Sequence, residues 1–182
     1  TPALFPLRLF AAAYTDIFRG IPVILTILLV GFGVPGLGLH RPWNSPYLWG
    51  SVALVLAYSS YVAEVFRAGI ESVHESQRAG ARSLGLSSGQ TLRFVVLPQA
   101  VRRVIPPLMN DFVSLQKDVA LISLIGPIEI LRQAGIDKSK FANFTPYVGA
   151  AIIFLLLTIP ETRFVDHLMT RERRRTSGTA VR

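Results

Sequence analysis

The sequence predicts an all-α membrane protein, a polytopic helical bundle with about four transmembrane spans. Only 16% of its 182 residues are charged and 51% are hydrophobic, whereas a soluble domain carries about 25% charged residues. Residues 20–39, 42–63 and 141–160 contain no Asp, Glu, Lys or Arg, and a helix of about 20 apolar residues crosses a bilayer. No alternating pattern is long enough for the strands of a membrane barrel. Three such stretches in one small chain therefore indicate membrane helices and not a soluble core.

The spans are expected within a membrane domain of residues 1–167, in chain order at residues 17–38, 46–66, 102–125 and 144–164. The second is expected to begin at Pro46, because proline is tolerated in the first turn of a helix. Trp43, Tyr47 and Trp49 beside it suit the membrane interface. Residues 168–182 are expected to form a basic, frayed tail.

A polar region, residues 67–101, separates the second span from the third. It contains several glycines and the pair Ser87-Ser88, so short helices with breaks are expected. Residues 72–84 are predicted to form one short helix with Gly85 as its C-terminal cap. A helix too polar for lipid needs a protein surface, so this region is interpreted either as a docking element for a cytoplasmic partner or as an ordinary interfacial helix. Spacing alone does not separate these two interpretations.

The positive charges predict the orientation of the chain. If the loops alternate between two sides, 14 of the 19 Lys and Arg residues fall on one side and 4 on the other, with Lys117 inside the third span. Positive residues concentrate on the cytoplasmic side. Residues 67–103 and the C-terminal tail are therefore predicted to be cytoplasmic, and residues 40–46 and 126–143 to face outward.

Charged side chains inside the third span are the first candidates for a functional site. Asp111 and Asp118 are seven residues apart and share a helix face, and Lys117 precedes Asp118. These groups could bind the ammonium and carboxylate of a zwitterionic solute, because intramembrane charges are functional by default; the alternative is a mutual ion pair that holds the bundle together. Glu64, at the cytoplasmic end of the second span, is either a path residue or an interfacial acid paired with a nearby arginine. In the third span, Ile105-Pro106-Pro107 is expected at a kink or in a first turn.

Several chemistries are excluded or unsupported. There is no cysteine, so no disulfide and no cysteine-ligated metal site exists, and no metal site is expected. No GxxxxGK[ST] segment occurs, so the chain has no P-loop for ATP. Gly31-Phe-Gly33-Val-Pro-Gly36 matches a dinucleotide pattern, but it closes an apolar span and does not follow a strand. The chain is therefore expected to be no enzyme and to bind no cofactor. The basic residues flank hydrophobic spans, so nucleic acid is not an expected partner.

Several segments, taken together and in order, carry a family resemblance. They are Phe18-Arg-Gly-Ile-Pro22, Tyr61-Val-Ala-Glu-Val-Phe-Arg-Ala-Gly-Ile70, Ala81-Arg-Ser-Leu-Gly-Leu86, Phe94-Val-Val-Leu-Pro-Gln-Ala100, Leu115-Gln-Lys-Asp118, Ser123-Leu-Ile-Gly126 and Glu129-Ile-Leu-Arg-Gln133. This ordered set closely resembles the polar amino acid permease family of ABC (ATP-binding cassette) importers. The resemblance extends from about Pro6 to Arg163, nearly the whole chain.

The resemblance implies a type I importer permease that forms the translocation path in the bacterial cytoplasmic (inner) membrane, with a cytoplasmic C-terminus. Such a permease pairs with an identical or a sister permease. A dimer of ATPase subunits, which binds ATP and Mg, docks on the cytoplasmic side, and an extracytoplasmic binding protein delivers the amino acid. Members of the family usually have a further span before the segment that resembles Tyr14–Gly20, so the first span of the family is expected to be missing here, through truncation or because a neighbouring subunit fills its place.

The family's coupling helix carries a Glu-Ala-Ala signature followed by a glycine. The matching positions are Ala79, Gly80 and Ala81, with Gly85 in the place of the glycine. The acid is absent at Ala79. The predicted ATPase-coupling residues therefore also include the flanking and nearby charges, which are Glu71, Glu75, Arg78 and Arg82.

Two rival functions remain at this point. One is a permease of another ABC importer class, for peptides, metals or osmolytes, which the cytoplasmic region would also fit. The other is a non-transporting membrane scaffold. The sequence leaves open which amino acid is carried and whether the permease forms a homodimer or a heterodimer.

Overall fold

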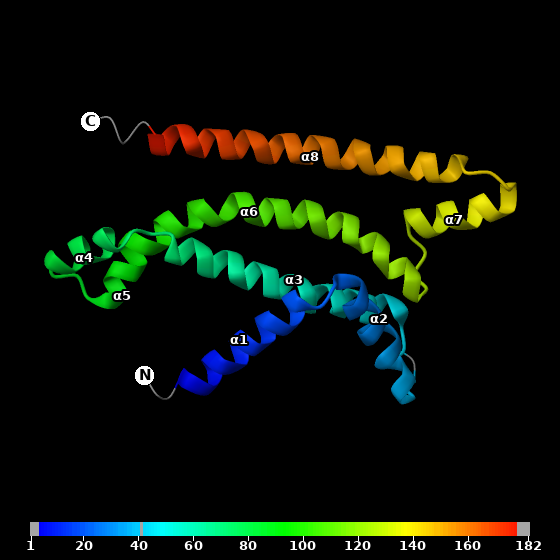
Figure 1. Ribbon diagram of the computed structural model, residues 1–182, viewed down its shortest axis with the longest axis horizontal. Helices are drawn as coiled ribbons and strands as arrows, with labels where there is room; N and C mark the ends of the chain where they lie inside the picture. The colour runs from blue at the N-terminus through cyan, green and yellow to red at the C-terminus, as the bar shows by residue number, and fades with distance from the viewer. Residues whose placement is uncertain (1–3, 41, 178–182) are drawn as a thin grey trace. The chain divides into compact units, whose positions relative to one another are not determined.

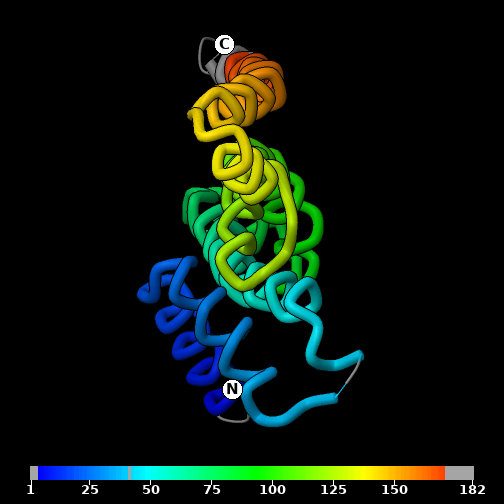
Figure 2. The backbone as a smooth tube through the Cα atoms, turned by 90° about the vertical axis from the view of Figure 1, so that its right-hand side faces the viewer, coloured from blue at the N-terminus to red at the C-terminus, as the bar shows by residue number. Residues whose placement is uncertain are grey.

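The computed structural model describes the backbone of residues 4–40 and 42–177 and the side chains of these ranges up to residue 170 (Figure 1). Figure 2 shows the same backbone turned by 90° about the vertical axis. Within the described residues every regular element is a helix, so the predicted all-α fold is confirmed. The elements are α1 (Phe5–Gly20), α2 (Val23–Gly33), η2 (Pro35–Leu37), α3 (Pro46–Glu71), α4 (Glu75–Ser83), α5 (Ser88–Thr91), η3 (Leu92–Val96), α6 (Leu97–Asp118), η4 (Val119–Ile125), α7 (Ile130–Phe141) and α8 (Thr145–Ser177).

The chain divides into two compact units. Unit 1 comprises Thr1–Tyr61 and Phe112–Glu161, and unit 2 comprises Val62–Asp111 and Thr162–Arg182. Helices α3, α6 and α8 each continue from one unit into the other.

Two helices in the described residues are long and apolar enough to cross a membrane. They are Pro46–Glu71 and the part of α8 at Thr145–Thr170, each 26 residues long. Two bent helix pairs also pass the same test: Phe5–Gly20 with Val23–Leu37, and Ser88–Ile125 with Ile130–Phe141. The described residues therefore supply two to four spans, and the count of four stays a prediction. The second predicted span does begin at Pro46, as expected.

The first predicted span, residues 17–38, is not one continuous helix. Helix α1 ends at Gly20 and α2 begins at Val23, and the two are bent by 103°. The reason lies in Ile21-Pro22, because the ring of a proline pushes the preceding residue out of the helical region. Ile21 is accordingly extended, with φ −94° and ψ 131°.

The prolines of the third span do not lie in a first turn, which corrects one of the two expected placements. Pro106 and Pro107 are inside α6, which begins nine residues earlier at Leu97. Proline has no N–H, so two i→i−4 hydrogen bonds of the helix are lost there. The helix continues nevertheless, because the fixed φ of proline, about −65°, is itself a helical value.

The core of unit 1 is built on small residues. Ala53 and Ala57 of α3 are fully buried and pack in one cluster with Ile27 of α2 and Ile125 of η4. Gly31 of α2 allows the same close approach, because a Cβ there would lie 2.5 Å from Cδ1 of Ile125. Small residues at helix contacts are typical of membrane proteins, where close packing and not water exclusion joins helices. Within the glycine motif at residues 31–36, Gly31 thus serves packing, whereas an added Cβ at Gly33 or Gly36 would meet nothing within 4 Å; no strand precedes the motif in the described residues.

Unit 2 has a smaller core around the polar region. Val73, Val96 and Ala100 are buried together, with Ile70 packed against them. This cluster joins the end of α3 to η3 and the start of α6. It gives the short helices of residues 75–96 a fixed base.

The prediction of a frayed tail is wrong for residues 168–177. Helix α8 continues without a break to Ser177. The segment after Thr170 contains Glu and Arg, which are good helix formers, and the first glycine comes at Gly178. Residues 178–182 of the predicted tail lie outside the described residues.

Candidate functional site

Helix α4 is the polar element of unit 2, and both of its ends are capped. At its start, Nδ1 of His74 accepts a hydrogen bond from the Ser76 N–H at 3.2 Å. At its end, Gly85 has φ +84°, and the N–H groups of Gly85 and Leu86 donate to the carbonyls of Arg82 and Ala81. This is the Schellman motif, which needs a left-handed residue and so favours glycine. Gly85 therefore caps the helix, as predicted. The helix itself is shorter than predicted, because it begins at Glu75 and does not include residues 72–74.

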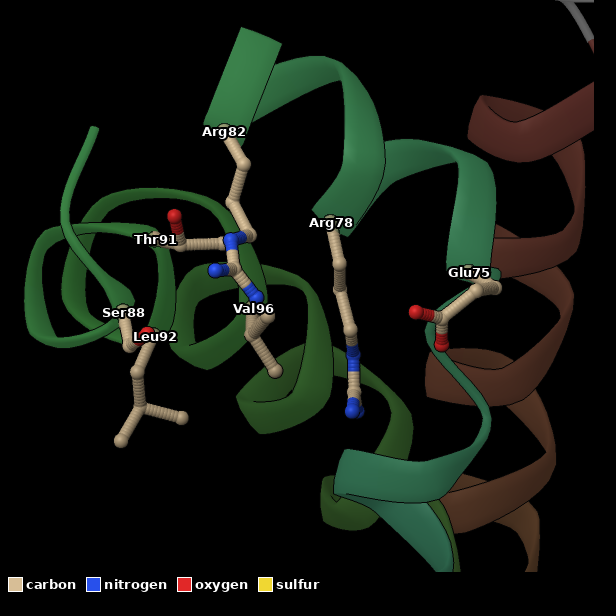
Figure 3. Close-up of a pocket in the computed structure, with 7 residues that line it drawn as sticks. All are labelled: Glu75, Arg78, Arg82, Ser88, Thr91, Leu92 and Val96. Carbon is tan, nitrogen blue, oxygen red and sulfur yellow. The ribbon is translucent and has the colours of Figure 1, made fainter. Parts of the chain in front are cut away.

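One face of α4 lines a pocket that we call the arginine pocket. Glu75, Arg78 and Arg82 occupy positions i, i+3 and i+7, which share a helix face. Figure 3 shows these side chains with the opposite wall of the pocket, which α5 and η3 supply. The volume is about 290 Å³, and the lining residues are Glu75, Arg78, Arg82, Ser88, Thr91, Leu92 and Val96.

Two arginines fix α4 to the rest of unit 2, a role that the sequence analysis did not identify for either. Nη2 of Arg78 donates to the Ile70 carbonyl at 2.6 Å. Nη1 of Arg103 donates to the carbonyl of Ser72 and, at 3.0 Å, to its Oγ. The Arg78 bond joins α4 to the end of α3, and the two Arg103 bonds hold Ser72 in the turn that follows, so together they set the angle at which α4 leaves the end of the span. The sequence gives no signal for such long-range side-chain bonds to backbone carbonyls.

The predicted coupling residues do not form one surface. Ala81 is buried, at 6% exposure, and faces the interior of its own unit. Ala79 and Gly80 are exposed, and Glu71 is the last residue of α3 and does not line the pocket. Only Glu75, Arg78 and Arg82 of the predicted set come together there.

The predicted path residues divide between the units. In unit 2, Glu64 pairs with Arg67 through two contacts, Oε1 to Nη2 at 2.7 Å and Oε2 to Nε at 3.0 Å. An ion pair with a nearby arginine agrees with the alternative to a path role, and the position of this pair at a membrane interface stays a prediction. Also in unit 2, Oδ2 of Asp111 is buried and has no hydrogen-bond partner among the described residues. A buried, unsatisfied carboxylate oxygen costs free energy, which is the signature expected where a ligand supplies the missing donor.

In unit 1, Asp118 accepts a hydrogen bond from the hydroxyl of Tyr58 on α3 at 2.9 Å. Lys117 is exposed, and it forms no ion pair with Asp118 within the described part of unit 1. The described part of unit 1 thus gives no support to a mutual ion pair of these two residues. Tyr58 was not predicted as a site residue, because a tyrosine within an apolar span is equally consistent with a core position.

A second polar contact in unit 1 joins α6 and α8. The amide of Gln116, oriented with its nitrogen toward Glu161, donates to that carboxylate. Glu161 follows Pro160 directly after the charge-free stretch, and the sequence analysis overlooked it. An acid near the end of an apolar span was the available signal.

The described residues contain no group of three or more His, Asp or Glu side chains arranged for a metal ion. The fold and these polar contacts define a class: a helical membrane protein that holds ionisable groups within its spans and carries a capped polar helix beside them. Residues 4–174 match the family described as the binding-protein-dependent transport system inner membrane component, and the chain belongs to that family. It is therefore a permease component of a transport system of the inner membrane.

Relatives with more specific names cover most of the chain. It is similar to the probable glutamine ABC transporter permease protein GlnM of Bacillus subtilis, with 35% identity over 91% of this chain and 76% of the relative. It is also similar to the arginine transport system permease protein ArtQ of the same organism, with 32% identity over 80% of this chain and 66% of the relative. A solved structure described as an amino acid ABC transporter with histidines matches with a TM-score of 0.86 and 34% identity, over 92% of this chain and 78% of that one.

Proposed function

We propose that this chain is the permease subunit of an ABC importer for polar amino acids. The observation that carries the proposal is the agreement of fold and sequence with an amino acid ABC transporter, at a TM-score of 0.86 and 34% identity over 92% of the chain. The names of the relatives, for glutamine and for arginine, support the substrate class. The permease provides the path, and ATP with Mg binds to a separate ATPase subunit.

In the proposed assembly this chain has three partners. An identical or sister permease completes the path, a dimer of ATPase subunits docks on the cytoplasmic side, and an extracytoplasmic binding protein delivers the solute. The excess of arginine around α4 and in the C-terminal segment supports a cytoplasmic position for both. Closure of the ATPase dimer pushes on α4, and the spans rock between outward-open and inward-open packings, a shift driven by differential binding.

The proposed solute contacts are Asp111, Lys117 and Asp118. The unsatisfied Oδ2 of Asp111 and the exposed amine of Lys117 support this role, because neither group has its charge neutralised by an ion pair within its own unit. Within unit 1, Lys117 and Asp118 supply an amine and a carboxylate for a zwitterion, and Asp111 supplies a carboxylate in unit 2. For Glu64 the observed pair with Arg67 supports the interfacial role in place of the path role.

Transport by a reconstituted complex tests the proposal. The tagged permease is purified in detergent with the subunits that accompany it, reconstituted into vesicles with ATP inside, and supplied with the cognate binding protein. We expect ATP-dependent uptake of a polar amino acid such as glutamine, arginine or histidine, and no uptake of a dipeptide. Uptake of the dipeptide, a metal ion or an osmolyte instead would establish another importer class, and a complex without any ATP-dependent uptake would favour the scaffold.

A further inference from the structure

The arginine pocket has an electrostatic character that its own residues do not neutralise. Its lining includes two guanidinium groups, Arg78 and Arg82, and one carboxylate, Glu75, which gives a formal sum of +1 (2 − 1). No ion pair within 4 Å joins Glu75 to either arginine in the described part of unit 2. The pocket therefore presents positive charge to whatever enters it.

Arg78 is held in place but is far from saturated with hydrogen bonds. One Nη2 bond to the Ile70 carbonyl anchors its guanidinium, and its buried Nε has no partner among the described residues. A guanidinium offers five N–H donors in a planar fork that matches a carboxylate. Because the anchored side chain has already lost its rotamer freedom, binding an anion there costs little additional entropy.

A second, independent polar group in the pocket also lacks a partner. Thr91 is 5% exposed, and its Oγ1 is buried without a hydrogen-bond partner among the described residues. A buried hydroxyl in that state is unusual. Thr91 lines the pocket (Figure 3), so its hydroxyl is a further potential donor to an oxygen atom bound there.

The surroundings of the pocket favour a protein partner over a free anion. Leu92 and Val96 form part of its wall, and Leu84, at the end of α4, is 82% exposed. A hollow lined by two arginines and by Leu92, which is 45% exposed, has the composition of a protein interface, where arginine and large apolar side chains are enriched. The volume of about 290 Å³ is that of roughly ten water molecules, which is enough for an acidic side chain and too large for a single ion.

We propose that the arginine pocket receives the side chain of an aspartate or glutamate of the ATPase subunit, whose carboxylate is bound by Arg78 and Arg82. This inference rests on the proposed function, since it names the chemistry by which the ATPase is held at α4. The negative charge at this contact is thus supplied by the ATPase, in keeping with the absence of an acid at Ala79. An anionic lipid headgroup is the competing occupant, which the experiments separate.

Charge reversal at an exposed position is the first test. Arg82→Glu changes a pocket residue, and Arg93→Glu makes the same change in charge on η3, outside the pocket lining. We expect the amount of ATPase bound to the detergent-purified permease to fall on the order of tenfold or more for Arg82→Glu, because like charges would then meet at the contact. For Arg93→Glu we expect little change. Equal loss for both variants, or no loss for Arg82→Glu, would overturn the inference.

A zero-length cross-link tests the contact directly. Arg82→Lys keeps the charge and introduces an amine, which a carbodiimide joins to a carboxylate only when the two touch. We expect a cross-link from Lys at this position to an Asp or Glu of the ATPase, mapped by mass spectrometry, and none from Arg93→Lys. An ATPase variant in which that acid is changed to Arg should bind the Arg82→Glu permease again. A cross-link found only to Glu75 of the same chain would refute the inference, since the pocket would then satisfy itself.

The remaining outcomes separate the two levels of the argument. If the wild-type permease brings down no ATPase and its vesicles show no ATP-dependent uptake, the proposed function fails and the inference with it. If wild type binds the ATPase and transports, but Arg82→Glu only weakens adsorption to vesicles that contain phosphatidylglycerol, the pocket binds lipid and the inference alone is wrong.

Discussion

A methyl group at Gly31 tests the packing that organises unit 1. In Gly31→Ala the new Cβ would lie 2.5 Å from Cδ1 and 3.0 Å from Cγ2 of Ile125. Carbon atoms in ordinary contact are about 3.5–4.0 Å apart, so the nearest pair falls short by about 1 Å (3.5 − 2.5). Overpacking of this kind costs about 1–3 kcal/mol, and the gain in helix propensity on replacing glycine returns about 1 kcal/mol. The net expectation is a loss of about 0–2 kcal/mol.

The neighbouring residues offer a matched control and a rescue. Gly33 lies in the same helix with nothing within 4 Å of its added Cβ, so Gly33→Ala is expected to be neutral or mildly stabilising. Ile125→Val removes the clashing Cδ1 and by itself costs about 0.5–1.5 kcal/mol. The double variant is expected to be more stable than the sum of the two single changes by about 1 kcal/mol, because the new methyl group fills the space that the removed one leaves.

Thermal unfolding of the detergent-purified protein measures this cycle, with ATP-dependent uptake as a check that each variant assembles. The melting temperature should fall for Gly31→Ala and should recover in part in the double variant with Ile125→Val. Strict additivity, or equal effects of Gly31→Ala and Gly33→Ala, would show that α2 and η4 do not meet as described.

Three further predictions concern the polar sites. Gly85→Ala forces a residue with a Cβ to φ +84° at a cost of about 1–2 kcal/mol and should weaken ATPase coupling. Gly80→Ala, inside α4 with open space around it, should instead stabilise the helix by about 1 kcal/mol. Lower ATPase binding and a lower melting temperature for Gly80→Ala than for Gly85→Ala would contradict the role of Gly85 as the cap. Tyr58→Phe removes the hydroxyl that donates to Asp118 and should lower stability by about 1–2 kcal/mol, and an unchanged melting temperature would show that the bond contributes nothing. Asp111→Asn should change amino acid uptake while the amount of bound ATPase stays the same; uptake at the wild-type rate would leave Asp111 with a structural role only.

The helical membrane character of this chain could be read from the sequence because it depends on local composition. Charge-free stretches of about 20 residues specify membrane helices wherever they pack, and an arginine excess specifies orientation without any tertiary contact. The cap at Gly85 was predictable for the same reason, since a Schellman motif uses only residues that are neighbours along the chain. Helix boundaries were less predictable. A helix ends before Pro22, but another helix continues through Pro106 and Pro107, and the sequence alone does not say which prolines a helix tolerates.

The sequence by itself therefore determined the class of the molecule, the place of its polar helix and the candidate charges of its third span. Only the tertiary structure decided which of those charges meet a partner. Asp118 receives a hydroxyl from Tyr58, 60 residues away in the chain, and Arg78 and Arg82 face the same pocket as Thr91. Such contacts depend on how distant segments pack, and packing is a property of the folded chain that no local pattern encodes.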